Sequence, residues 1–123
     1  GVCLYYKDPI PLKHRPDLEI FPECIVCEIS IKYKKFFYVL IYRSPSQSPD
    51  EFSNFIDKMQ DLIDQISLEN PFSIILTGDF NARSPLFWDD ENIETPEGKR
   101  LSDLALANGL EQIINQPTHF PRP

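Results

Sequence analysis

Residues 73–83, Ser-Ile-Ile-Leu-Thr-Gly-Asp-Phe-Asn-Ala-Arg, decide how the rest of this sequence can fold. The stretch begins with a run of β-branched and aliphatic residues without alternation, which predicts a strand buried on both faces. The run breaks at Gly78, and Asp79 and Asn81 follow at once. Because sheets of mixed α/β domains present ligands at the carboxyl ends of their strands, we expect polar side chains at such an end.

A structural turn explains the same residues. Asp and Asn hydrogen-bond nearby backbone groups and tolerate left-handed conformations, so Gly-Asp and Asp-x-Asn are common turn sequences. Taken alone, Asp79 and Asn81 favour a turn over a binding site. A functional interpretation therefore depends on the elements around them.

The helix before this strand has the clearest pattern in the chain. Ser48 is placed to be its N-cap, Pro49 to take the first helical position and Glu51 to complete a capping box. Apolar residues recur at intervals of three and four, at Phe52, Phe55, Ile56, Met59, Leu62, Ile63 and Ile66. The opposite, solvated face carries Asp57, Lys58, Asp61 and Asp64. Asn70-Pro71 ends the helix, and strand 73–78 follows. The helix can therefore cross over from the preceding strand and let strand 73–78 join the same sheet.

Two strands are expected before the helix. Residues 24–31 and 36–42 are rich in Ile, Val, Phe and Tyr, and the short polar segment 32–35 joins them, which predicts an antiparallel hairpin. The three lysines of that segment favour a solvated hairpin end over a cluster that contacts nucleic acid. Residues 1–6 predict a first strand, and the four prolines of residues 7–23 predict a loop that no helix crosses.

The last third of the chain predicts a loop, a helix and a strand. We expect a long loop over residues 84–94, in which Trp88 packs on the domain surface rather than against a base. Thr95 and Pro96 then begin a second helix, Gly109 follows its end, and Leu101, Leu104 and Ala105 form its buried side. Residues 110–114 predict one more strand. No repeat or internal boundary is evident, so residues 1–123 are expected to form a single domain.

Composition and charge narrow the class of protein. The chain has 41% hydrophobic and 12% aromatic residues, which is typical of a globular domain. Its formal net charge of −7 does not favour nonspecific binding to nucleic acid, which depends on Lys and Arg. The charge does not exclude a cation-dependent nuclease, because such an enzyme needs local carboxylates. No stretch approaches the roughly 18 apolar residues of a membrane span. We therefore expect no membrane partner and a nuclear or cytoplasmic protein that is not secreted.

The cysteines at positions 3, 24 and 27 give no sign of a disulfide or zinc framework. Cys24 and Cys27 lie three residues apart in an expected strand, so their side chains would point to opposite faces. No second pair of cysteines follows them. Buried, reduced thiols are the expected state.

The order of motifs along the chain resembles the endonuclease/exonuclease/phosphatase superfamily. The motifs are Tyr42 after a strand, Gly-Asp-Phe-Asn-Ala at 78–82, Trp88, Gly98 with Leu101, and Pro-Thr-His-Phe at 117–120. Within that superfamily, Tyr-Arg-Ser-Pro-Ser at 42–46 and Gly-Asp-Phe-Asn-Ala-Arg-Ser at 78–84 are most similar to the endonuclease domain of non-LTR (LINE, jockey-like) retrotransposons. The resemblance covers essentially the whole chain.

This resemblance implies an α/β fold, a four-layer sandwich of the DNase I-like type. It also implies Mg²⁺-dependent cleavage of phosphodiester bonds in DNA and a covalently linked reverse transcriptase in the full-length element. Asp79 matches the aspartate that helps to activate the attacking water, and Asn81 the asparagine that orients the scissile phosphate. Tyr42 matches an active-site tyrosine near that phosphate, and Thr118 a threonine on the nucleic-acid side. Attack on a phosphate does require such acceptors and donors.

Several parts of the family pattern have no counterpart here. These are the opening strand with its asparagine, the metal-binding glutamate, and the closing Ser-Asp-His segment with the catalytic histidine. None of Glu19, Glu23 and Glu28 stands in the context of the metal-binding glutamate, so no metal ligand is assigned in this chain. We expect a domain that is incomplete at both ends, and little or no activity in the isolated fragment.

Two alternative functions stay open at this point. The first is a phosphatase of the same fold that acts on a phosphorylated small molecule or lipid. The second is a non-catalytic relic of a mobile element that keeps only the shape of the sheet.

Overall fold

The computed structural model describes residues 1–82 and 94–114. The contacts divide the chain into two compact units, Gly1–Asn81 and Ala82–Pro123. The first unit holds β1 (Leu12–His14), the 3₁₀ turn η1 (Pro16–Leu18), β2 (Cys24–Ile31), β3 (Lys34–Tyr42), α1 (Pro49–Ser67) and β4 (Ser73–Asp79). The second unit holds α2 (Pro96–Ala107).

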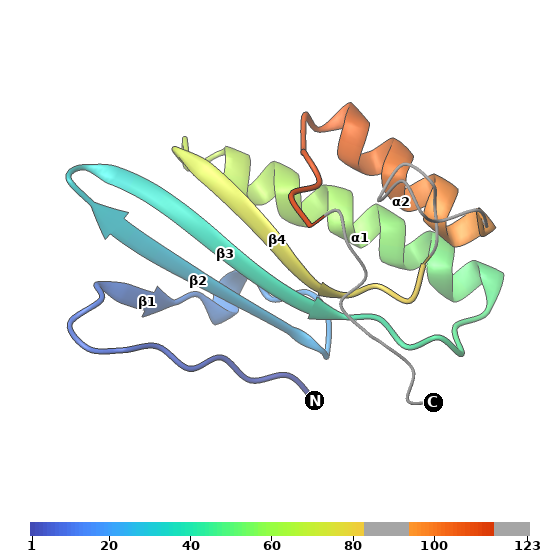
Figure 1. Ribbon diagram of the computed structural model, residues 1–123, viewed down its shortest axis with the longest axis horizontal. Coiled ribbons are helices and arrows are strands. Elements are labelled where there is room, and N and C mark those ends of the chain that lie inside the picture. The colour runs from blue at the N-terminus through green and yellow to red at the C-terminus, as the bar shows by residue number, and fades with distance from the viewer. Residues whose placement is uncertain (83–93, 115–123) are drawn as a thin grey trace. The chain divides into compact units, whose positions relative to one another are not determined.

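A four-stranded sheet in the order β1-β2-β3-β4 forms the first unit (Figure 1). β1 and β3 both pair with β2 in antiparallel fashion, whereas β4 pairs with β3 in parallel. The hairpin between β2 and β3 turns at Lys32 and Tyr33, which both have positive φ. The predicted hairpin, and the helical connection that brings 73–78 into the same sheet, are both confirmed.

Helix α1 lies across one face of the sheet (Figure 1). Its capping box is formed: the Ser48 hydroxyl accepts from the Glu51 N–H at 3.2 Å, and the Glu51 carboxylate accepts from the Ser48 N–H at 3.3 Å. The predicted apolar stripe is buried except for Ile56, which is half-buried, and Asp57, Asp61 and Asp64 are exposed. The side chains of β2 and β3 that have no exposed surface are Val26, Phe37, Val39 and Ile41.

The start of the chain differs from its prediction. Residues 1–6 form no strand, and the side chain of Tyr5 is 92% exposed. The neighbour of β2 is instead the three-residue β1, inside the segment expected to be a loop. β1 and η1 fit there because β1 lies between Pro11 and Pro16, and proline is acceptable at the first position of η1. An aromatic run alone does not make a strand, since strands need a partner.

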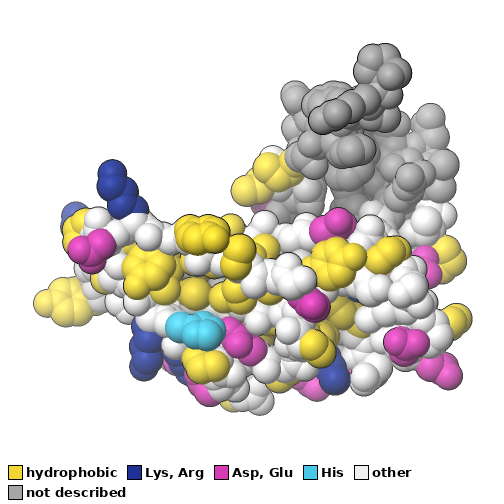
Figure 2. Space-filling model, turned by 90° about the horizontal axis from the view of Figure 1, so that it is seen from below, with side chains coloured by type: hydrophobic (Ala, Val, Ile, Leu, Met, Phe, Trp, Pro, Cys, Tyr) yellow, Lys and Arg dark blue, Asp and Glu magenta, His cyan; other side chains and the backbone are white. Residues whose placement is uncertain are grey.

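Strand β4 is also less buried than predicted. None of its residues is fully buried, and Ile75 is 42% exposed. β4 pairs only with β3 among the described residues, so it forms the edge of this sheet. Figure 2 shows that hydrophobic side chains also lie on the face of the molecule seen from below. The uninterrupted apolar run in the sequence therefore predicted the strand correctly but predicted its burial wrongly.

In the second unit, the predicted helix is confirmed and the predicted strand is wrong. The Thr95 hydroxyl accepts from the Gly98 N–H at 3.0 Å, Leu101 and Leu104 are buried, Ala105 is half-buried, and Gly109 follows the helix with φ +68°. Residues 110–114 form no strand, and residues 111–114 are exposed. Within the described ranges this segment pairs with no neighbouring strand, and apolar composition does not supply one. Trp88 and residues 84–93 of its predicted loop lie outside the described residues.

Cysteines 24 and 27 are buried and free, as expected. Burial raises the pKa of Cys24 to about 11 and also raises the pKa of Cys27. Both thiols are therefore protonated near neutral pH, which makes them weak nucleophiles.

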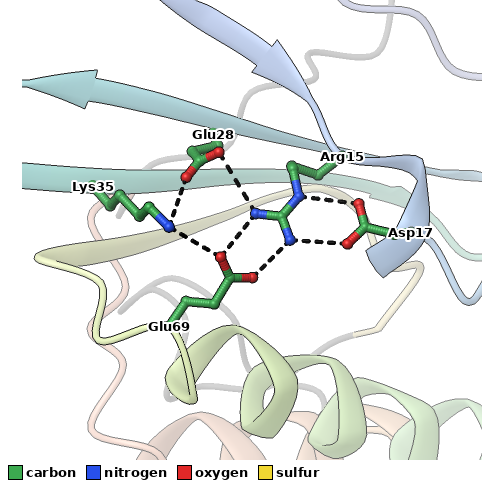
Figure 3. Close-up of polar contacts among 5 residues, drawn as sticks. All are labelled: Arg15, Asp17, Glu28, Lys35 and Glu69. Atoms are coloured by element: carbon green, nitrogen blue, oxygen red, sulfur yellow. Dashed lines mark hydrogen bonds and ion pairs between the residues drawn. The ribbon is translucent and has the colours of Figure 1, made fainter.

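The lysine-rich turn is only partly solvated. Lys35 binds Glu28 at 3.0 Å and Glu69 at 3.1 Å, and Arg15 binds Glu69 at 2.7 Å and Asp17 at 2.9 Å (Figure 3). Arg15, followed by Lys35, holds the pKa of Glu69 at about 2. These ion pairs fasten the start of β3 to the residues after α1, which corrects the expectation that Lys35 is simply solvated.

Candidate active site

Two of the predicted site residues meet at the carboxyl ends of neighbouring strands. Tyr42 is the last residue of β3, Asp79 is the last residue of β4, and they are register partners in the parallel pair. Partners in register project their side chains to the same face of a sheet. Tyr42 is 39% exposed and Asp79 is exposed, so a carboxylate and a phenol are accessible together at this edge.

Gly78 allows the two strands to approach at this point. Its φ is +146°, and a Cβ placed on it would lie 1.7 Å from the Ile41 carbonyl oxygen. Any side chain at position 78 would therefore clash with the backbone of β3. The glycine in the Gly-Asp-Phe-Asn motif is thus required by packing, directly before the residue that carries the carboxylate.

Asn81 is tied to Asp79 and to the end of β3. Its φ is +47°, a left-handed conformation that asparagine tolerates better than most residues. Its backbone N–H donates to Asp79 Oδ1 at 3.1 Å, and its side-chain Nδ2 donates to the Arg43 carbonyl at 2.6 Å. The turn interpretation and the site interpretation are therefore compatible, because one turn fixes the Asp79 carboxylate through the Asn81 backbone N–H and fixes the Asn81 side chain through the Arg43 carbonyl.

Arg43 was not among the residues predicted from the sequence, and it is only 4% exposed. Its side chain donates to the carbonyl oxygens of Phe80 and Asn81, each at 2.5 Å, and its cation lies 5.0 Å from the centre of the Phe52 ring. The signal in the sequence is an arginine directly after an apolar strand. Arginine is rarely fully buried unless its N–H groups form hydrogen bonds, so such a position indicates nearby acceptors.

The fourth predicted site residue, Thr118, lies outside the described residues, as do Arg83 and the Pro-Thr-His-Phe motif. The described part of the candidate site thus holds the predicted residues Tyr42, Asp79 and Asn81. It offers one carboxylate, one carboxamide and one phenol, a set that can accept a proton from water and donate hydrogen bonds to phosphate oxygens.

A magnesium site is not complete in these residues. Across residues 1–82 and 94–114, no group of three or more His, Cys, Asp and Glu side chains is arranged to hold a metal ion. Mg²⁺ needs near-octahedral oxygen ligands, and Asp79 is a single carboxylate.

In the same ranges, no helix is both long and apolar enough to cross a bilayer.

A solved structure shares this fold. It is the "Endonuclease domain of TRAS1, a telomere-specific non-LTR retrotransposon", with a TM-score of 0.73 and 18% sequence identity. The match covers 91% of this chain and 47% of that structure, so this chain spans about half the length of the matched chain. The likeness confirms the mixed α/β fold of the DNase I-like type. A search of curated proteins finds no match.

A family model settles the relationship. The model described as "Endonuclease-reverse transcriptase" matches residues 36–123, which include most of β3, all of α1 and β4, and the four predicted site residues. The match covers well over half of the chain and agrees with the motif order in the sequence. The chain therefore belongs to the endonuclease-reverse transcriptase family.

Proposed function

We propose that this chain carries the Asp79 part of a Mg²⁺-dependent endonuclease site that nicks DNA during retrotransposition. The observation that supports it best is the meeting of Tyr42 and Asp79 at the ends of parallel strands, with Asn81 bonded to the Asp79 carboxylate. Family membership supports a nuclease role. The DNA substrate, the magnesium ion and a linked reverse transcriptase are part of the proposal.

Each residue has a chemical task in this proposal. The exposed Asp79 carboxylate accepts a proton or hydrogen bond from the attacking water. The Asn81 amide nitrogen carries two N–H groups, and the one that does not bind Arg43 donates to a nonbridging phosphate oxygen. The Tyr42 hydroxyl donates to the same phosphate, and Thr118 contacts the nucleic acid. No step is assigned to a metal ion, because the described residues do not form its site.

A plasmid-nicking assay tests this function. We expect the full-length protein to relax supercoiled plasmid in the presence of Mg²⁺, and Asp79→Ala to lower the rate by at least about 100-fold. Release of phosphate from a phosphomonoester, without nicking, would instead indicate a phosphatase. Nicking that is unchanged by Asp79→Ala would contradict the proposed site.

Residues 1–123 alone are proposed to have little activity. The metal-binding glutamate and catalytic histidine of the resembling domains have no counterpart among these residues. In the same assay, the 123-residue chain should therefore nick far more slowly than the full-length protein. Turnover by residues 1–123 that Asp79→Ala abolishes would overturn this point but not the proposed role of Asp79.

A further inference from the structure

Arg43 is connected to residues 79–81 by four hydrogen bonds. Its backbone N–H donates to the Asp79 carbonyl at 2.9 Å, and its backbone carbonyl accepts from Asn81 Nδ2 at 2.6 Å. The guanidinium adds bonds from Nε to the Phe80 carbonyl and from Nη2 to the Asn81 carbonyl, both at 2.5 Å. Arg43, directly after β3, thus binds each of residues 79–81, which include the Asp79 carboxylate and the Asn81 amide.

The other side of Arg43 is fixed by the connection to α1. Nη1 donates to the Ser44 carbonyl at 3.2 Å and to Gln47 Oε1 at 3.1 Å. The guanidinium lies over the ring of Phe52, which is 4% exposed and sits in the first turn of α1. The planar fork of an arginine can bind two adjacent carbonyl oxygens at once, whereas the single ammonium of lysine cannot reproduce that geometry.

These contacts bear on the conformation of Asn81. A left-handed φ is strained for a residue with a side chain, so the +47° of Asn81 needs support from its surroundings. In this conformation the Asn81 N–H points at Asp79 Oδ1. The carbonyls that Arg43 binds belong to the peptide groups on either side of Asn81. Arg43 therefore acts on the two reactive groups through the backbone between them.

We propose that Arg43 is a positioning residue of the phosphodiester site, which holds Asn81 in its left-handed conformation and thereby orients the Asp79 carboxylate and the Asn81 amide. This rests on the proposed function of Asp79 and Asn81. Arg43 itself does not contact the phosphate in this proposal. Its loss should impair the chemical step more than substrate binding.

The first test follows the conformation of Asn81 by NMR in the ¹⁵N-labelled protein. In the wild type, the side-chain N–H that binds the Arg43 carbonyl should be shifted from a solvated amide and slow to exchange. Arg43→Gln should bring the Asn81 side-chain resonances to solvated positions and shift the backbone resonances of residues 79–82. Arg43→Lys should move them part of the way. Arg15→Lys is the matched control, because Arg15 binds carboxylates near the other end of β3.

The second test measures nicking by the full-length protein with Mg²⁺. Arg43→Lys and Arg43→Gln should lower kcat by roughly 10- to 100-fold, the scale expected when reactive groups are misplaced, and change KM less than twofold. Arg15→Lys should leave both constants near the wild-type values. Should Arg43→Gln not fold, Arg43→Lys decides the kinetic result.

The outcomes separate this proposal from the function on which it rests. Unchanged Asn81 resonances in both Arg43 variants would overturn positioning, whatever the activity. An Asp79→Ala variant that loses activity while both Arg43 variants keep the wild-type kcat would also overturn it. Asp79→Ala with full activity would refute the catalytic site, and the positioning role with it. A fall in stability without any change at Asn81 would assign Arg43 to folding alone.

Discussion

A buried or half-buried arginine stands near each end of strand β3, and the two make different kinds of contact. At the Lys35 end, Arg15 binds the carboxylates of Asp17 and Glu69. At the Tyr42 end, Arg43 binds the backbone carbonyls of Phe80 and Asn81. At the first end the charged side chains bind one another. At the second end the arginine binds backbone, so the side chains of Asp79 and Tyr42 stay exposed. Contacts to the backbone can hold a loop in place without occupying its functional groups.

The largest expected effect is at the Tyr42 end. Gly78→Ala would place a Cβ against the Ile41 carbonyl and separate β4 from β3, at a cost of about 3 kcal/mol in the free energy of unfolding. Urea denaturation followed by circular dichroism measures it. Gly109→Ala is the matched control, because Gly109 also has positive φ but a Cβ there meets nothing within 4 Å. Equal losses in the two variants would argue against the close approach at Gly78.

The Lys35 end should respond to pH. Arg15 and Lys35 hold the pKa of Glu69 at about 2, below the 4.5 of a free glutamate. A depressed pKa stabilises the fold fully above about pH 4.5, and this contribution is lost as the pH falls towards 2. At pH 7, Glu69→Gln should lower the free energy of unfolding by about 1 to 2 kcal/mol, allowing for solvent screening.

Urea titrations at pH 7 and pH 3 check this prediction. The gap between wild type and Glu69→Gln should narrow at pH 3. The NMR signals of Asn81 should not change in the variant, because the ion pairs of Glu69 lie at the other end of β3. A gap independent of pH would show that Glu69 contributes through packing and not through its charge.

A smaller effect isolates the left-handed conformation at the Tyr42 end. Asn81→Ala and Asn81→Gly both remove the hydrogen bond from the side chain to the Arg43 carbonyl. Only glycine adopts φ near +47° without strain, so the alanine variant should be about 1 kcal/mol less stable than the glycine variant. Thermal unfolding of the pair gives the difference. Equal stabilities would mean that the left-handed conformation is not maintained in solution.

The smallest effect on stability is expected at Tyr42. Tyr42→Phe removes one hydroxyl from a side chain that is 39% exposed, and the free energy of unfolding should change by less than about 0.5 kcal/mol. Nicking should nevertheless fall if the hydroxyl donates to the phosphate. Tyr38→Phe, the same change earlier in β3, is the matched control and should keep the wild-type rate. Equal rates for both variants would remove Tyr42 from the proposed site.

Local signals predicted much of this fold. Ser48 and Glu51 predicted the start of α1 because a capping box depends only on residues three apart. How deeply β4 is buried, and which strand pairs with β2, depend on how the strands are arranged in the sheet and not on local sequence. Residues 1–6 and 110–114 were therefore wrongly predicted as strands from their composition.

The candidate site was predictable to a similar extent. Asp79 and Asn81 stood out because they follow a strand directly, and Tyr42 was found through its resemblance to a family. Arg43 was not recognised, since its role depends on carbonyl groups nearly forty residues away. The pairing of Tyr42 with Asp79 likewise follows from the register of β3 and β4, which no local pattern determines.

The most direct test of the site is the nicking rate of Asp79→Asn in the full-length protein with Mg²⁺. This change keeps an oxygen that can accept from the Asn81 N–H but removes the charge that can take a proton. We predict a rate at least about 100-fold below the wild type, with unchanged stability, while Asp61→Asn on the exposed face of α1 keeps the full rate. An Asp79→Asn variant that nicks within twofold of the wild-type rate would contradict a catalytic role for Asp79.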